Sequence, residues 1–171
     1  LRDILAMIRI RTGQDFTWYK RATLYRRLAR RMQVCQSETI AEYHRLLREQ
    51  PNEVGLLLRD FLISVTNFFR DPEAFASLAS HAIPRLFGGK AQGDQVRVWV
   101  AGCATGEEAY SLGILLAEHA ALMPDPPQLQ IFATDIDVAT LAEARSGLYP
   151  ESISTDISQE RLDRFFTRES G

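Results

Sequence analysis

The chain has 171 residues, of which 46% are hydrophobic and 25% charged, and its formal net charge at pH 7 is -2. These values are typical of a soluble globular protein of one domain or two small ones. The longest apolar stretches, such as residues 112–117, are too short to span a bilayer, and the chain does not open with a signal-peptide pattern. Cys35 and Cys103 lack a second cysteine or histidine at metal-ligand spacing. We therefore expect a cytoplasmic protein without membrane insertion, a disulfide framework or a metal site.

The first half of the chain has the pattern of consecutive helices. Apolar residues recur at helical spacing before Gly13, and a second helix is predicted over residues 19–34. The Thr39–Glu42 pair predicts a capping box that begins a third helix, and a fourth is predicted after Pro51. Asp71 followed by Pro72 is typical of an N-cap and a first helical turn. No strand pattern occurs before residue 95, so this half is predicted to be all-helical.

The second half alternates strand and helix patterns. Strands rich in β-branched residues are predicted over 96–100 and 129–133, with a helix over 107–122 between them. Shorter helices are predicted from Asp137 and over 159–166. This order predicts a parallel sheet whose ligand lies at the carboxyl ends of the strands. A doubly wound sheet has about five or six strands, so we expect the chain to be part of a longer polypeptide.

Residues 102–106, with the sequence GCATG, connect the first predicted strand to its helix. The loop matches neither the G-x-G-x-x-G pattern of dinucleotide-binding folds nor the P-loop, because no lysine follows it. Glu107 and Glu108 come directly after the loop, where they would repel a diphosphate by about 1 kcal/mol or more per charge pair. S-adenosylmethionine instead offers a sulfonium cation, an ammonium group and a ribose diol. It is the cofactor that these residues favour, and Gly102 allows it a close approach to the backbone.

The acidic residues around the loop have different predicted roles. Thr105 and Glu108 match a capping box, so Glu108 is assigned mainly to the helix start and Glu107 is the better ligand candidate. Asp135 follows the second predicted strand, where a carboxylate can accept hydrogen bonds from a ribose diol. Asp137 is predicted to cap the next helix.

Three motifs together resemble a known family. They are SVTNFFRDPEAF (64–75), VWVAGCATGEEAYSL (98–112) and FATDIDVATLAEARSGLYP (132–150), and their order and spacing are similar to those of the chemotaxis receptor methyltransferase family, CheR. The basic segment 19–32 also resembles the N-terminal helical domain of that family. The resemblance implies an α/β chain with an all-helical substrate-recognition domain (1–70), a linker helix and loop (71–95), and the first part of a Rossmann-like S-adenosylmethionine-dependent methyltransferase domain (96–171).

The resemblance also implies an activity, the S-adenosylmethionine-dependent methylation of glutamate side chains on chemotaxis receptors. Its products are glutamyl methyl esters and S-adenosylhomocysteine. By position, the resemblance implies cofactor contacts at Thr66, Arg70, Glu107 and Asp135, and at Ser64, where enteric members have asparagine. Arg70 is also the candidate catalytic residue, because its planar guanidinium can orient a carboxylate. A first-turn ion pair with Asp71 or Glu73 is the structural alternative for this arginine.

The predicted helix over 19–34 is unusually basic. Six lysine and arginine residues lie between Phe16 and Ser37 without an acidic residue among them, although helices usually mix the two charges. We expect this face to bind an acidic partner, namely the glutamate-rich helices of methyl-accepting chemotaxis receptors. The predicted substrate contacts are Lys20, Arg26, Arg27, Arg30 and Arg31.

Three other functions remain open from the sequence. A nucleic-acid-binding methyltransferase would use the basic helix against phosphates, but the rest of the chain is acidic, and we expect no nucleic-acid partner. An NAD-linked oxidoreductase is disfavoured by the two glutamates and by the missing third glycine. A non-catalytic receptor-docking fragment would keep the basic helix without a closed cofactor site, and we expect the 171 residues by themselves to be inactive.

Overall fold

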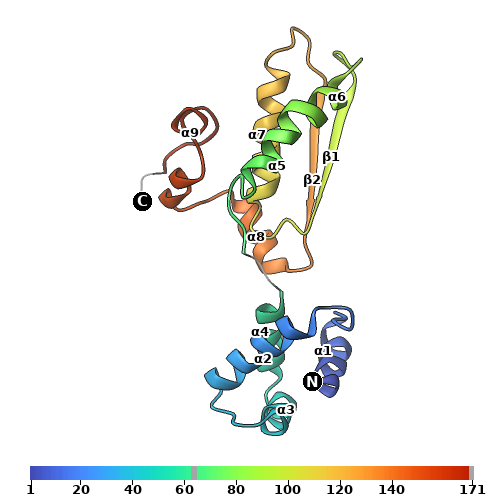
Figure 1. The fold of residues 1–171 in the computed structure, drawn as a ribbon, viewed down its shortest axis with the longest axis vertical. Coiled ribbons are helices and arrows are strands. Elements are labelled where there is room, and N and C mark those ends of the chain that lie inside the picture. The colour runs from blue at the N-terminus through green and yellow to red at the C-terminus, as the bar shows by residue number, and fades with distance from the viewer. Residues whose placement is uncertain (63–64, 170–171) are drawn as a thin grey trace. The chain divides into compact units, whose positions relative to one another are not determined.

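The computed structural model describes residues 1–62 and 65–169, and the chain divides into two compact units, residues 1–63 and 64–171 (Figure 1). Each unit has its own hydrophobic core. Phe68 and Phe69, which the sequence analysis places with the N-terminal helices, are instead buried in the core of the second unit. Their aromatic rings pack there against Tyr149 and Phe75. Within the described residues, no helix is both long and apolar enough to cross a membrane.

The first unit is built from helices α1 (Arg2–Thr12), α2 (Arg21–Val34), α3 (Ile40–Glu49) and α4 (Pro51–Phe61). α1 ends at Gly13, which adopts a left-handed φ of 77°. The predicted capping box of α3 is confirmed, because Thr39 and Glu42 each accept a hydrogen bond from the backbone N–H of the other. The core forms where apolar residues recur three or four positions apart on each helix; its members include Ile4, Ile8, Leu24, Leu28, Tyr43, Leu47, Val54, Leu57 and Phe61.

A buried ion pair links three helices of this unit. Arg31 of α2 donates from Nε to Oε1 of Glu53 on α4 at 2.9 Å and from Nη2 to Oε2 at 2.7 Å. The hydroxyl of Tyr43 on α3 donates to the same Oε1 at 2.7 Å. The Glu53 side chain is only 6% exposed and that of Arg31 only 13%. Arg31, predicted with the basic surface, is therefore directed into the core, where its guanidinium already has a carboxylate partner.

The second unit begins with a helical segment made of α5 (Pro72–Ser77), the π-helical turn η1 (Leu78–Ala82) and α6 (Ile83–Phe87). Asp71 caps α5 as predicted, since its carboxylate accepts the N–H of Ala74 at 3.5 Å. Pro84 has no amide hydrogen and its ring crowds the preceding turn, which accounts for the widened turn just before it.

Strands β1 (Gln95–Ala101) and β2 (Gln128–Thr134) are joined through α7 (Glu107–Ala120) and pair in parallel, as predicted. The register places Ala101 opposite Thr134, so both strands end at the same edge of the sheet. Val96 and Val100 are buried, whereas Trp99 is 70% exposed, so the helices cover one face of the strands (Figure 1). The 102–106 loop and Asp135 therefore emerge side by side at this edge.

The rest of the unit consists of α8 (Val138–Ser146), the 3-10 turn η2 (Glu151–Thr155) and α9 (Gln159–Phe165). Arg161 of α9 forms a bidentate ion pair with Glu118 of α7, at 2.8 and 2.9 Å. Its guanidinium also lies 4.5 Å from the centre of the Phe69 ring. An all-helical unit followed by a partial βαβ unit confirms the predicted fold class.

Candidate functional site

The 102–106 loop is anchored to the end of β2. The N–H groups of Gly102 and Cys103 both donate to the carbonyl of Thr134, at 2.7 and 3.0 Å. The N–H of Gly106 donates to the carbonyl of Cys103 at 2.8 Å. Gly102, Ala104 and Gly106 all have positive φ values, of 73°, 47° and 100°. The loop is thus a tightly folded turn whose backbone faces the edge where both strands end.

Asp135 connects this loop to the start of α8. Its Oδ2 accepts the N–H of Ala104 at 2.8 Å, and its Oδ1 accepts the N–H of Asp137 at 2.8 Å. Asp137 in turn caps α8 by accepting the N–H of Ala139, as predicted. Each carboxylate oxygen has two lone pairs, so Asp135 keeps acceptor capacity for two ligand hydroxyls. The structure therefore fixes this carboxylate beside the loop.

The first turn of α7 differs from the prediction. The N-cap is Gly106, in a left-handed conformation without a side-chain cap, so the predicted Thr105–Glu108 capping box is wrong. The hydroxyl of Thr105 instead donates to Oε2 of Glu107 at 2.6 Å. The left-handed residue shifts the helix start by one position and leaves Thr105 too early to cap it. Glu107, the predicted ligand candidate, is thus oriented by Thr105, and Glu108 does not have the capping role that was predicted for it.

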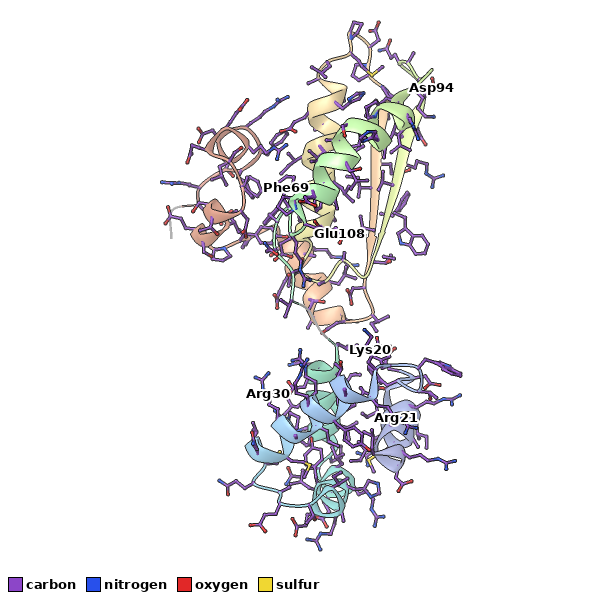
Figure 2. The ribbon with its side chains drawn as sticks, in the orientation of Figure 1. Lys20, Arg21, Arg30, Phe69, Asp94 and Glu108 are labelled. Atoms are coloured by element: carbon purple, nitrogen blue, oxygen red, sulfur yellow. The ribbon has the colours of Figure 1, made fainter. Side chains whose placement is uncertain are left out.

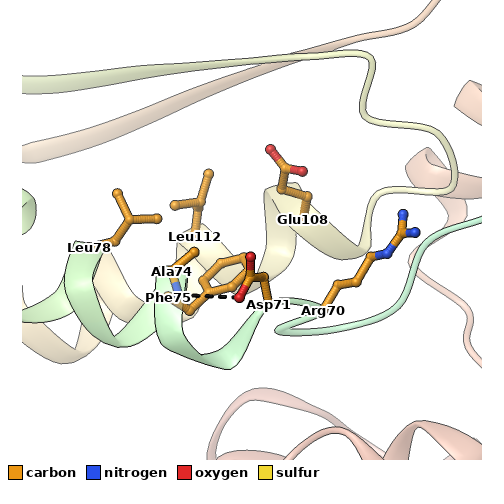
Figure 3. Close-up of a pocket in the computed structure, with 7 residues that line it drawn as sticks. All are labelled: Arg70, Asp71, Ala74, Phe75, Leu78, Glu108 and Leu112. Carbon is orange, nitrogen blue, oxygen red and sulfur yellow. Dashed lines mark hydrogen bonds between the residues drawn. The ribbon is translucent and has the colours of Figure 1, made fainter.

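Glu108 lies on a cavity of about 490 Å³ (Figure 3). Arg70 lies at one end of the view, while Leu78 and Leu112 gather at the other. The Asp71 carboxylate on this cavity accepts the Ala74 N–H through one of its oxygens. The site therefore combines one cation and two carboxylates with an apolar wall, which is a suitable lining for an amphipathic ligand. The lining residues are Arg70, Asp71, Ala74, Phe75, Leu78, Glu108 and Leu112.

Arg70 owes its position to a strained residue and a buried hydroxyl. Phe69 has a φ of 49°, which is rare for a bulky side chain and turns the chain sharply before Arg70. The N–H of Phe69 donates to Oγ of Ser111 at 3.1 Å, and this hydroxyl donates to the carbonyl of Glu107 at 2.7 Å. Ser111 is fully buried. It thereby joins the segment that carries Arg70 to the helical turn that carries Glu107.

Of the predicted cofactor contacts before the sheet, Arg70 and Thr66 lie within the described residues. Arg70 donates from Nη1 to the carbonyl of Val65 at 2.7 Å. The ion pairs found among the described residues do not include one from Arg70 to Asp71 or Glu73, the structural alternative for this arginine. Thr66 is half-buried. Ser64 lies outside the described residues.

The charge around the loop suits a cationic ligand. Burial raises the pKa of the Cys103 thiol, and the negative charges of Asp135 and Glu108 raise it further. Four loop N–H groups already donate within the protein, those of Gly102, Cys103, Ala104 and Gly106. A phosphate cradle needs such groups free to face the anion. The residues present therefore fit S-adenosylmethionine and disfavour a diphosphate.

In the first unit, the predicted substrate contacts lie on α2 and at its N-cap, Lys20; Lys20 and Arg30 are labelled in Figure 2. Lys20, Arg26 and Arg30 are exposed, and Arg27 is half-buried. Arg21, which the prediction omitted, is also exposed and labelled with Lys20 and Arg30 in Figure 2. The exposed cations of α2 and its N-cap are thus Lys20, Arg21, Arg26 and Arg30, and we call these four residues together the α2 basic surface, with Arg26 and Arg30 one turn apart on the same side of the helix.

Two residues that contact the loop or its helix, Ser111 and Tyr149, are not predicted by the sequence patterns. The Tyr149 hydroxyl donates to the carbonyl of Thr105 at 2.6 Å from 44 positions away. Both residues lie within the family motifs, 98–112 and 132–150. No sequence pattern relates a serine or a tyrosine at these positions to a loop contact. Only the tertiary fold brings them there.

Comparisons with known proteins match both units. The family model described as the CheR methyltransferase all-alpha domain matches residues 1–62, and the CheR methyltransferase SAM binding domain matches residues 64–171. The chemotaxis protein methyltransferase of Salmonella typhimurium is 35% identical over 172 residues, which cover 99% of this chain and 57% of that protein. The Escherichia coli protein of the same name is 32% identical with the same coverage. An uncharacterized 104.1 kDa protein of Rhodobacter capsulatus is 40% identical over 171 residues, which are 18% of its length. The chain thus spans little more than half of the chemotaxis methyltransferases that it matches.

Proposed function

Because the chain belongs to the CheR methyltransferase family, we propose that the whole protein methylates glutamate side chains of chemotaxis receptors and forms glutamyl methyl esters. S-adenosylmethionine is the cofactor of the matched domain. The proposal rests mainly on the two acidic residues beside the 102–106 loop, Glu107 and Asp135. Thr105 orients Glu107 there, and Asp135 is fixed against the backbone of Ala104.

The cofactor would be held by residues at the strand ends. Asp135 would accept hydrogen bonds from the ribose diol, and Glu107 would contribute negative charge beside the loop. Gly102 is exposed and has no side chain to obstruct a ligand. Thr66 and Ser64 complete the proposed contacts from the segment before the sheet. When bound, the cofactor supplies an electrophilic methyl group on a sulfonium.

The substrate carboxylate needs no general base. A glutamate side chain has an ordinary pKa of about 4.3 and is already ionised at neutral pH. Arg70 orients this carboxylate by exchanging its present bond to the Val65 carbonyl for a charge-assisted bond. The apolar wall formed by Phe75, Leu78 and Leu112 limits water around the reacting oxygen. With S-adenosylmethionine bound, these residues would hold the carboxylate oxygen in line for transfer of the methyl group.

The α2 basic surface is the proposed docking site for the receptor. Lys20 is the N-cap of α2, and the helix that carries the other three cations, RATLYRRLARRMQV, contains no acidic residue. Glutamate-rich helices present the complementary charge, which accelerates encounter and favours the correct partner. Esterification removes one negative charge from the substrate, so the attraction weakens once the product has formed.

The reaction itself provides the test of the proposed function. We expect the full-length protein to transfer a radiolabelled methyl group from S-adenosylmethionine to the cytoplasmic fragment of a chemotaxis receptor. Mild base is expected to release the label as methanol, because a carboxyl ester is base-labile. Replacement of the acceptor glutamates with alanine is the control and should remove the label. Base-stable label, or label on nucleic acid instead of the receptor, would contradict the proposal.

Charge reversal on α2 separates docking from cofactor binding. For the double variant Arg26→Glu/Arg30→Glu we expect the KM for receptor to rise about tenfold or more, because two attractive contacts become repulsive. The dissociation constant for S-adenosylhomocysteine should stay within about twofold. The matched control is Arg45→Glu/Arg48→Glu, which reverses two exposed arginines of α3 in the same unit. Equal effects of the two double variants would show that α2 has no specific role.

A further inference from the structure

We propose that Tyr149 is a positioning residue of the cofactor loop, an inference that rests on the proposed function. Its hydroxyl donates to the carbonyl of Thr105 at 2.6 Å. Thr105 is the residue whose own hydroxyl donates to Oε2 of Glu107. Tyr149 therefore fixes the peptide of the residue that orients the proposed cofactor ligand.

The Tyr149 ring is held rigidly enough to serve this purpose. It packs edge to face against Phe68, with ring centres 4.9 Å apart, and against Tyr110 at 5.8 Å. The Tyr110 hydroxyl donates to the carbonyl of Ala144 at 2.9 Å, which ties α7 to α8. The phenol thus approaches the loop from a packed aromatic cluster, and its hydroxyl has little freedom to move away.

Tyr149 also closes the space behind Gly106. A Cβ atom added to this glycine would lie 2.9 Å from the Tyr149 hydroxyl and 3.0 Å from the Ala144 Cβ. The side chains of Tyr149 and Ala144 therefore pack directly behind the turn at Gly106. Burial raises the pKa of Tyr149, and the charge of Glu107 raises it further, so the hydroxyl remains a donor at neutral pH.

The hydrogen bond is short, partly buried and spans 44 positions of sequence. Loss of a neutral hydrogen bond of this kind changes an equilibrium constant by about fivefold. Loss of this bond would change the conformation of the loop and the orientation of Glu107. The contacts of the Tyr149 ring with Phe68 and Tyr110 would remain. The effect should therefore appear in cofactor binding more than in global stability.

The test uses Tyr149→Phe in the full-length protein, with Tyr110→Phe as the matched control. Tyr149→Phe keeps the ring and removes only the hydroxyl. We expect about fivefold weaker binding of S-adenosylhomocysteine and a similar rise in the KM for S-adenosylmethionine, with kcat changed less than twofold. Tyr110→Phe removes a bond to α8 instead, and should change these values less than twofold.

Amide hydrogen exchange without cofactor gives an independent readout. We expect faster exchange at residues 104–108 in Tyr149→Phe than in the wild type or in Tyr110→Phe. Wild-type affinity and unchanged loop exchange in Tyr149→Phe would overturn the positioning role while leaving the proposed function intact. Failure of the wild-type protein to bind S-adenosylhomocysteine would overturn the proposed function, and the cofactor-binding role of Tyr149 with it.

Discussion

Replacing Gly106 with alanine is expected to reduce the affinity for S-adenosylhomocysteine by about 100-fold or more. Gly106 has a φ of 100°, a region in which an added Cβ costs roughly 1–2 kcal/mol. The new methyl group would also lie 3.0 Å or less from Ala144 and Tyr149, and overpacking of this kind costs roughly 1–3 kcal/mol. The loop must then refold, and refolding removes both the Thr105–Glu107 bond and the surface next to Asp135. Titration calorimetry measures the change.

Gly93→Ala is the matched control for this substitution. Gly93 has nearly the same φ, 96°, but an added Cβ would meet nothing within 4 Å. Gly93→Ala therefore has the free-energy cost of a side chain at positive φ, but no steric overlap with neighbouring atoms. We expect Gly93→Ala to bind S-adenosylhomocysteine within about twofold of the wild type, because Gly93 precedes the start of β1 whereas the loop follows its end. Equal behaviour of the two variants would mean that the packing behind Gly106 has no role in cofactor binding.

Removing the Glu53 carboxylate is expected to unfold the helical unit. Glu53→Ala leaves the buried Arg31 guanidinium and the Tyr43 hydroxyl without their acceptor. Breaking a buried pair in this way costs about 3–5 kcal/mol, which is a large fraction of the stability of a unit of this size. Urea unfolding monitored by amide hydrogen exchange in α2, α3 and α4 measures the loss in the full-length protein.

Two comparison variants isolate the ion pair. Arg9→Ala removes the exposed pair with Asp15 and should cost less than about 1 kcal/mol. The triple variant Arg31→Met/Tyr43→Phe/Glu53→Leu removes all the polar partners together and should recover most of the stability lost in Glu53→Ala. If Glu53→Ala were as stable as Arg9→Ala, the buried pair would not be what holds the three helices together.

The same carboxylate gives the helical unit a pH dependence. Burial alone would raise the pKa of Glu53, but the hydrogen bonds from Arg31 and Tyr43 outweigh it and leave the pKa below its ordinary value. A lowered pKa means that its stabilisation is complete above about pH 4.3 and is lost as the pH falls through the folded-state value. The urea midpoint of the unit should therefore fall with acidification below that range, and by less in the triple variant.

Local patterns predicted the elements that form the fold. The strands, α7 and the parallel pairing followed from short β-branched runs on either side of a helical pattern. The caps at Thr39, Asp71 and Asp137 followed from residue types that compete for free N–H groups. The place of Asp135 beside the loop followed from the rule that parallel strands end at one edge.

Tertiary contacts determine the features that local sequence patterns did not predict. A left-handed Gly106 moved the start of α7, so the residues that matched a capping box were out of register. Arg31 lies among cations in the sequence, yet a carboxylate 22 positions away draws it into the core. The sequence around Phe69 does not predict its positive φ. That conformation is imposed by the hydrogen bond of Phe69 to Ser111 and by packing of its ring against Phe75 and Arg161.

An NMR titration of the ¹⁵N-labelled full-length protein with S-adenosylhomocysteine, and separately with NAD⁺, tests most directly whether the acidic loop selects an S-adenosyl cofactor. We predict saturable shifts of the backbone amides of Ala104, Glu107 and Asp135 with S-adenosylhomocysteine, and none of comparable affinity with NAD⁺. Equal or tighter binding of the diphosphate at residues 102–108, or S-adenosylhomocysteine binding that leaves these amides unshifted, would contradict the account.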